Sequence, residues 1–220
     1  MTDLLQLWSN SFPVLLRGYW ISLQVTGASL ILGIPLGLLL ALAVQSRRRA
    51  VRMPALVVVE VGRGAPLLVL LQFVYFGLPS VGLTLSGFIS AALAFAWCTG
   101  AYTSEIIRAG LEAVPHGQKE AAEALGFRRS DALRFVILPQ GLRVSIPALL
   151  GFSILMLQAS SLCFAISLPE LLSKAYQIGL STFRYMPLLV LAAALYAAVC
   201  IPATLVVGVL ERRMGRHDKT

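Results

Sequence analysis

The chain has 220 residues, of which 58% are hydrophobic and 13% are charged, and its mean hydropathy is +0.82. A soluble domain usually has about a quarter of its residues charged, so this composition excludes an ordinary soluble protein. The formal net charge of +8 comes from 18 Lys and Arg against 10 Asp and Glu. In so apolar a chain, this excess indicates basic loops beside a lipid bilayer and not a nucleic-acid partner.

Five stretches are apolar over the roughly 20 residues that a helix needs to cross a bilayer. In chain order they are residues 19–44, 54–78, 87–109, 146–168 and 187–210. Transmembrane strands would instead alternate in hydropathy over about 10 residues. The sequence therefore predicts an all-α polytopic membrane protein with about five transmembrane helices. They form a transmembrane domain, 19–211, which an extracytoplasmic segment, 1–18, precedes and a tail, 212–220, follows.

The basic residues between these stretches predict the orientation of the chain. Fourteen of them fall on one side of the predicted membrane: Arg47, Arg48, Arg49, Arg52, Arg108, Lys119, Arg128, Arg129, Arg134, Arg143, Arg212, Arg213, Arg216 and Lys219. Arg17, Lys174 and Arg184 fall on the other side. Because loops rich in Lys and Arg stay in the cytoplasm, we expect the N-terminus outside and the C-terminus inside.

The loop 110–145 between the third and fourth stretches is then cytoplasmic, and its centre, "EAAEALGFRRSDALRFVILPQ", is charged. Helix formers after "PHG" at 115–117 predict about two helical turns, which Gly126 ends in a left-handed conformation. The i+3 and i+4 spacings place Ala121, Ala122 and Leu125 on one face, with Glu120 and Glu123 toward the other side.

A second short helix is predicted to follow in this loop. Ser130 is expected to cap the helix "DALRFVIL", which is expected to stop before Pro139. Two turns of helix are marginal alone in water, so a partner surface is expected to stabilise the loop. The plain alternative is a solvated connector that rests on the membrane surface.

The residues of the loop favour the partner. "EAA" at 120–122, three residues, Gly126, nine residues and "VILP" at 136–139 together resemble the cytoplasmic signature of permease subunits in bacterial ATP-binding-cassette (ABC) importers. Val136 stands where that family more often has isoleucine. Further segments resemble its polar amino acid branch: "EVGRGAPLLVLLQFVYFGLP" at 60–79, "GAYTSEIIRAGLEAVPHGQKEAAEALG" at 100–126, "VILPQGLRVSIPAL" at 136–149 and "LPELL" at 168–172.

This resemblance implies a type I importer permease of five to six helices in the bacterial inner membrane. The implied partners are two cytoplasmic ATPase subunits, a second copy or a homologous permease, and an extracytoplasmic solute-binding protein. The loop would act as a coupling helix in a groove of the ATPase. The resemblance gives this role to Glu120, Ala121, Ala122, Leu125, Gly126, Phe127 and Pro139.

Polar residues within the predicted spans are candidates for the substrate path. Gln158, Ser160 and Ser161 in "LQASSL" offer amide and hydroxyl groups at bilayer depth, where such groups usually find partners. Many relatives have "KDTSL" here, so Gln158 and Ala159 replace a Lys and an Asp, and the solute is left open. Hydrogen bonding between helices is the alternative role.

A second candidate pair lies in the second predicted span. Glu60 and Arg63 are three residues apart, so they share a helix face and are placed to pair. A charge at a helix centre costs about 2.5–3.5 kcal/mol on insertion scales, so such residues need partners. The pair is expected either beside the translocation path or as an ion pair between helices, with Arg63 also close enough to the cytoplasmic end to snorkel.

No residues for catalysis, metal binding or a resident cofactor are predicted. Cys98, Cys163 and Cys200 lie in apolar segments without paired spacing, and His116 and His217 are isolated. The sequence also contains no G-x-x-x-x-G-K-[ST] phosphate loop, so ATP is expected on a partner subunit. Two other classes stay open at this point. A secondary transporter usually needs a coupling-ion site and repeats, and a membrane-anchored interaction protein needs neither a polar path nor an ATPase.

The predicted orientation can be tested by labelling single cysteines with a membrane-impermeant maleimide. We expect cysteines at Ser46 and Ser130 to react only from the cytoplasmic side, and cysteines at Thr84 and Ser181 only from outside. Intact cells and inside-out vesicles give the two measurements. A cysteine at Thr84 that reacts from the cytoplasm would contradict the five-span prediction.

Overall fold

A computed structural model describes residues 2–214, and the regular structure within that range is entirely helical. The α-helices are α1 (Thr2–Val44), α2 (Arg49–Gly64), α3 (Leu67–Gln72), α4 (Gly87–Glu112), α5 (His116–Ala124), α6 (Arg129–Ala132), α7 (Leu138–Ala159), α8 (Leu171–Thr182) and α9 (Tyr185–Met214). Short π- and 3-10-helical turns are η1 (Phe73–Gly77), η2 (Leu78–Val81), η3 (Leu133–Ile137) and η4 (Ser160–Ile166). The prediction of an all-α chain is confirmed.

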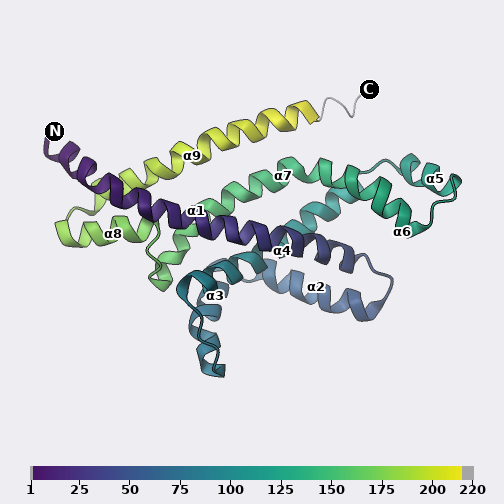
Figure 1. The fold of residues 1–220 in the computed structure, drawn as a ribbon, viewed down its shortest axis with the longest axis horizontal. Coiled ribbons are helices and arrows are strands. Elements are labelled where there is room, and N and C mark those ends of the chain that lie inside the picture. Colours follow the sequence, from purple (N-terminus) through teal and green to yellow (C-terminus); the bar gives the residue numbers. More distant parts are fainter. Residues whose placement is uncertain (1, 215–220) are drawn as a thin grey trace.

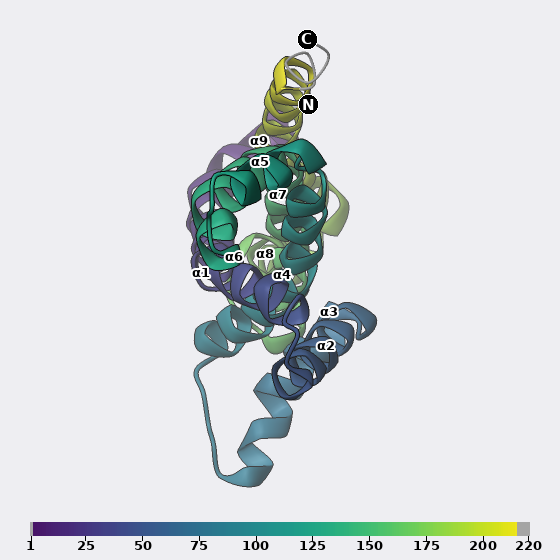
Figure 2. The ribbon, with the colours of Figure 1, turned by 90° about the vertical axis from the view of Figure 1, so that its right-hand side faces the viewer.

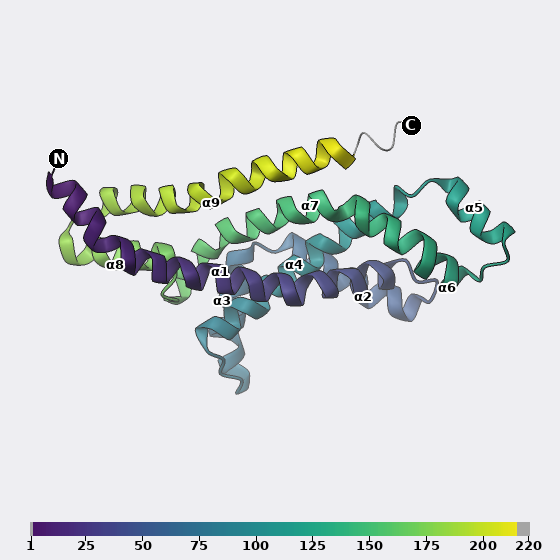
Figure 3. The ribbon, with the colours of Figure 1, turned by 45° about the horizontal axis from the view of Figure 1, so that its top comes forward.

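The helices form an elongated bundle along the direction of α1 (Figure 1). Helices α4 and α7 run beside α1, and α9 diverges from them toward its C-terminal end (Figure 3). Viewed from one end, α2 and the arm from α3 to η2 lie to one side of the bundle (Figure 2). The turn after α1, the helices α5 and α6, and the end of α9 lie at one end of the molecule, opposite α8. The loops that contain most of the basic residues therefore gather at one end, as the predicted orientation requires.

The helix lengths differ from the predicted spans. Three helices are long and apolar enough to cross a membrane, Asp3–Val44, Arg129–Ile166 and Tyr185–Met214, and a bent pair from α2 to η2 makes up to four. Residues 2–18 are not a separate segment, because α1 runs through them without a break. Helix α4 is not among these three, although it packs between α1 and α7. The number five and the orientation stay predictions, and residues 215–220 of the predicted tail lie outside the described range.

The second predicted span, 54–78, is broken in the structure. Helix α2 ends at Gly64, and the chain turns by 108° before α3. The cause is local: Ala65 precedes Pro66 and has the extended conformation (φ −85°, ψ 136°) that a residue before proline prefers. Pro66 also has no N–H to continue the helical hydrogen bonding.

Helices α1 and α4 approach each other through small residues. A Cβ atom added at Gly33 would lie 2.5 Å from Cβ of Thr99, and one at Gly37 would overlap Oγ1 of Thr103 and lie 3.0 Å from the carbonyl oxygen of Gly100. Small residues of this kind allow helix backbones to approach closely in a membrane, where packing drives association. The main apolar core forms beside this contact, around the fully buried Phe95.

The close approach can be tested by adding a side chain at Gly37. We expect Gly37→Val to lower the stability of the purified protein by about 1–3 kcal/mol, because overpacking forces the two helices apart. Gly27→Val is the matched control, since nothing lies within 4 Å of the position of a Cβ there, on the same helix. The measurement is the melting temperature of both variants in detergent. Equal melting temperatures would contradict the close contact.

Candidate coupling loop and polar bend

Helix α5 ends as the glycine predicts. Gly126 has φ +78°, in the left-handed region, and its N–H donates to the carbonyl of Glu123 at 2.9 Å. The N–H of Phe127 donates to the carbonyl of Ala122 at 3.0 Å. These two hydrogen bonds form a Schellman cap, which satisfies carbonyls that the helix end would leave unpaired. The stop at Gly126 and its left-handed conformation are confirmed.

The apolar residues of α5 do not share one face. Ala122 is 3% exposed and faces α6 and η3, whereas Leu125 is 78% exposed and Phe127 is 40% exposed. Ala121 and Glu120 are also exposed. A large side chain at Ala122 would therefore disrupt the loop itself. Ala121, Leu125 and Phe127 form an exposed apolar surface at the end of α5, which we call the α5 surface.

The predicted second helix starts and ends differently. Arg128 and not Ser130 is the N-cap residue of α6, and no side chain caps it. The helix also continues past Pro139 into α7. The reason is the π-helical turn η3: the N–H of Leu138 donates to the carbonyl of Leu133, five residues back. A π-turn inserts one residue into the helix and lets the chain pass the proline without the clash that would end an α-helix.

One long helix consequently joins the loop to the predicted substrate path. The helical run Arg129–Ile166 starts beside α5 and ends in η4. Gln118 of α5 also contacts the start of α7 directly, since its Oε1 accepts a hydrogen bond from Nε2 of Gln140 at 3.3 Å. The loop with α5 and α6 thus lies at one end of α7 and is connected to it through the chain and through this hydrogen bond (Figure 3).

The far end of α7 is a polar bend, which we define as residues 158–161. Here the α-helix becomes 3-10 helix, and the hydroxyl groups of Ser160 and Ser161 donate to carbonyls three residues back. Ser160 is fully buried and lies 3.2 Å from the hydroxyl of Tyr196 on α9. Gln158 is exposed on the surface of the chain. The structure thus separates the three candidates: Ser160 joins helices, Ser161 is half-buried and donates a hydrogen bond to the backbone of its own turn, and Gln158 faces outward.

Glu60 and Arg63 are not paired with each other. Arg63 lies on α2 with Nη1 3.8 Å from Oε2 of Glu105 on α4, and Glu60 is exposed. Glu105 in turn accepts from Arg108 at 2.6 Å, and Arg108 also donates to Glu112 at 2.8 Å. The E-x-x-R-x-x-x-E spacing of 105–112 was readable as helical i+3 and i+4 pairs. This spacing begins in the third predicted span, outside the pair Glu60 and Arg63.

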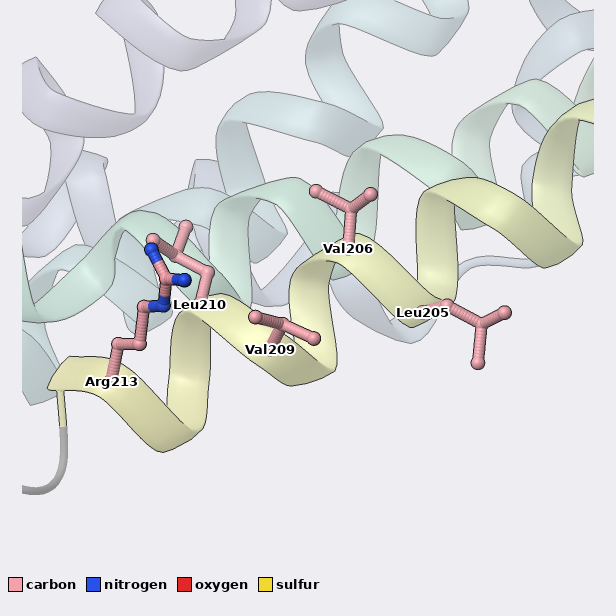
Figure 4. A pocket seen from close by; sticks show the side chains of 5 residues that line it. All are labelled: Leu205, Val206, Val209, Leu210 and Arg213. Atoms are coloured by element: carbon pink, nitrogen blue, oxygen red, sulfur yellow. The ribbon is translucent and has the colours of Figure 1, made fainter.

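A groove of about 350 Å³ on the outer face of α9 is lined by Leu205, Val206, Val209, Leu210 and Arg213 (Figure 4). All five residues come from one helix, four of them are aliphatic, and none of the predicted site residues contributes. A polar solute would find one charged group here and no amide or hydroxyl partner. The groove is therefore no candidate for the substrate site. Among residues 2–214, no three His, Cys, Asp or Glu side chains gather as a metal site would need.

Comparison with known proteins identifies the family. Residues 33–216 match the family model of the binding-protein-dependent transport system inner membrane component. The chain is 39% identical over 216 residues to the L-cystine transport system permease protein TcyB of Bacillus subtilis, covering 98% of this chain and 92% of the relative. It is 35% identical over 208 residues to the probable amino-acid ABC transporter permease protein YckA of the same organism, covering 94% and 92%.

The fold agrees with solved transporters. The crystal structure of an amino acid ABC transporter with histidines matches with a TM-score of 0.88 and 34% identity, covering 93% of this chain and 96% of that chain. The inward-facing MetNI methionine ABC transporter, at 22% identity and a TM-score of 0.67 over 90% and 96%, shares the fold. The predicted type I importer fold is confirmed, and the chain is a transport component without an ATPase site of its own. It belongs to the family of binding-protein-dependent transport system inner membrane components, among the amino-acid ABC transporter permeases.

Proposed function

We propose that the chain is the permease subunit of an ATP-driven importer in the bacterial inner membrane. It translocates a polar amino acid, or a solute like one, that an extracytoplasmic solute-binding protein delivers. A separate cytoplasmic ATPase binds the ATP and drives the cycle through the α5 surface. The observation that carries this proposal is the continuous helix from η3 through α7, which joins that surface to the polar bend.

The ATPase contact is supported by what α5 leaves uncovered. Nine residues of helix are too few to be stable alone in water, and Ala122 is the one buried residue of α5. Leu125 and Phe127 remain exposed at the end of the molecule where the basic loops gather. An apolar groove on the ATPase would bury both side chains. Each buried side chain of this size contributes about 1.5–3 kcal/mol.

A second permease is supported by the position of the polar bend. Gln158 lies on the surface of the single chain, so a second copy or a homologous permease is needed to enclose a polar path. Gln158 and Ala159 offer no charge to the solute, which favours contacts to amide, hydroxyl or backbone groups of the solute over ion pairs. ATPase closure would push on α5 and tilt α7, and the path would open alternately to either side.

The coupling role is tested by Gly126→Val. A side chain in the left-handed conformation costs about 1–2 kcal/mol, so the end of α5 should shift and ATPase association should weaken about 5- to 30-fold. Leu125→Arg should weaken it without disturbing the chain, because Leu125 is 78% exposed. The measurements are pull-down of the ATPase subunit and solute uptake by proteoliposomes.

Gly117→Val is the matched control for the loop. Gly117 lies in the same helix, has open space around it and has no positive φ, so an added side chain meets no comparable strain. We expect this variant to hold the ATPase. If Gly126→Val and Leu125→Arg also hold it and transport at wild-type rates, the coupling role is wrong.

The path role is tested by Gln158→Leu. The Gln158 side chain is exposed, so its replacement should leave the fold of the chain unchanged. We expect solute uptake to fall at least about ten-fold, the effect of losing one good polar contact of about 1.4 kcal/mol, while the complex still assembles. Loss of the purified complex would instead show that Gln158 holds the two permeases together.

A further inference from the structure

Glu170 is the only acidic or basic residue that is buried within residues 3–214, and its exposure is 0%. It directly precedes α8, at the end of the molecule opposite the coupling loop. A buried carboxylate is costly unless hydrogen bonds surround it. Its position in "LPELL", between the fourth and fifth predicted spans, does not predict this burial.

The carboxylate first of all caps α8. Its Oε2 accepts from the N–H of Leu172 at 2.8 Å, and its Oε1 accepts from the N–H of Ser173 at 2.7 Å. Both N–H groups belong to the first turn of the helix and have no partner within it. A capping role alone would be served by Ser, Thr, Asp or Asn at an exposed position. It does not explain why the carboxylate is buried.

Two further donors reach the same carboxylate from other helices. The hydroxyl of Tyr196 on α9 lies 3.3 Å from Oε2, and the hydroxyl of Ser22 on α1 lies 3.5 Å from it. Tyr196 and Ser22 are themselves 3.3 Å apart, and Ser22 accepts from the N–H of Leu171 at 3.4 Å. Tyr196 also contacts Ser160 of the polar bend at 3.2 Å. Ser22, Ser160, Glu170 and Tyr196 thus form one cluster, which we call the Glu170 cluster.

The Glu170 cluster lies between α8 and the polar bend. On one side is α8, where Leu180 is exposed and where Phe183, directly after the helix, is 88% exposed in a left-handed conformation. On the other side is the polar bend, where Gln158 and Ser161 flank Ser160. A hydrogen-bonded group that joins α8 to the polar bend can pass a displacement from one to the other, because such networks are rigid and have few alternative arrangements.

We infer that Glu170 is a positioning residue that couples the outer helix α8 to the polar bend through Tyr196. This inference rests on the proposed function, in which the loaded binding protein meets the outer face. Docking on α8 would move its first turn, and the carboxylate would transfer that movement through Tyr196 to Ser160. A loaded binding protein on the outer face would in this way change the position of Ser160 in the polar bend.

The test is Tyr196→Phe in the full transporter, reconstituted with its ATPase and binding protein. The substitution removes the hydroxyl that joins Glu170 to Ser160, and it keeps both the cap of α8 and the edge-to-face contact between the Tyr19 and Tyr196 rings. We expect ATPase stimulation by the loaded binding protein to fall about five-fold or more, with unchanged basal hydrolysis. Ser22→Ala, which removes a second member of the cluster, should act in the same direction.

Tyr75→Phe is the matched control. Tyr75 lies in η1, its ring packs edge-to-face against Phe76, and it belongs neither to α8 nor to the Glu170 cluster. It should leave stimulation unchanged. The inference is overturned if Tyr196→Phe and Ser22→Ala keep wild-type stimulation, or if basal and stimulated hydrolysis fall together. If the wild-type complex shows no stimulation at all, the proposed function fails instead.

Discussion

The close contact between α1 and α4 is the interaction on which the rest of the structure depends. Gly33 and Gly37 leave no room for a side chain against Thr99, Gly100 and Thr103, so the two backbones lie at one fixed separation. Helix α1 runs the length of the bundle and also contacts α2, α7, α8 and α9. Because α4 leads into the coupling loop and α1 reaches α8, this contact provides one frame for both ends of the molecule.

Helix α7 is the element that our proposal expects to move relative to α1 and α4. It begins at the π-turn η3, where the chain passes Pro139, and it ends at the polar bend. Both ends are departures from regular α-helix, and such departures are frequent at functional sites. The loop with α5 and the Glu170 cluster contact opposite ends of the helical run Arg129–Ile166. The proposed coupling between ATPase and solute would run along this helix.

Much of this was predictable from the sequence, because apolar length and glycine chemistry are local properties. They predicted the helical class and the stop at Gly126 in a left-handed conformation. The break at Pro66 was missed because hydropathy averages over a proline in an apolar run. The burial of Ala122 and Glu170 depends on contacts with residues far along the chain, such as Tyr196, and no local pattern contains that information.

Cross-linking from the α5 surface tests the central claim most directly. A single cysteine at Leu125 would be the reactive thiol, because the native Cys98, Cys163 and Cys200 are buried. In the assembled transporter, we expect a short thiol cross-linker to join this cysteine to the ATPase subunit, and we expect the cysteine to be protected from a water-soluble maleimide. A cysteine at Leu125 that forms no cross-link and is labelled as fast with the ATPase as without it would contradict the account.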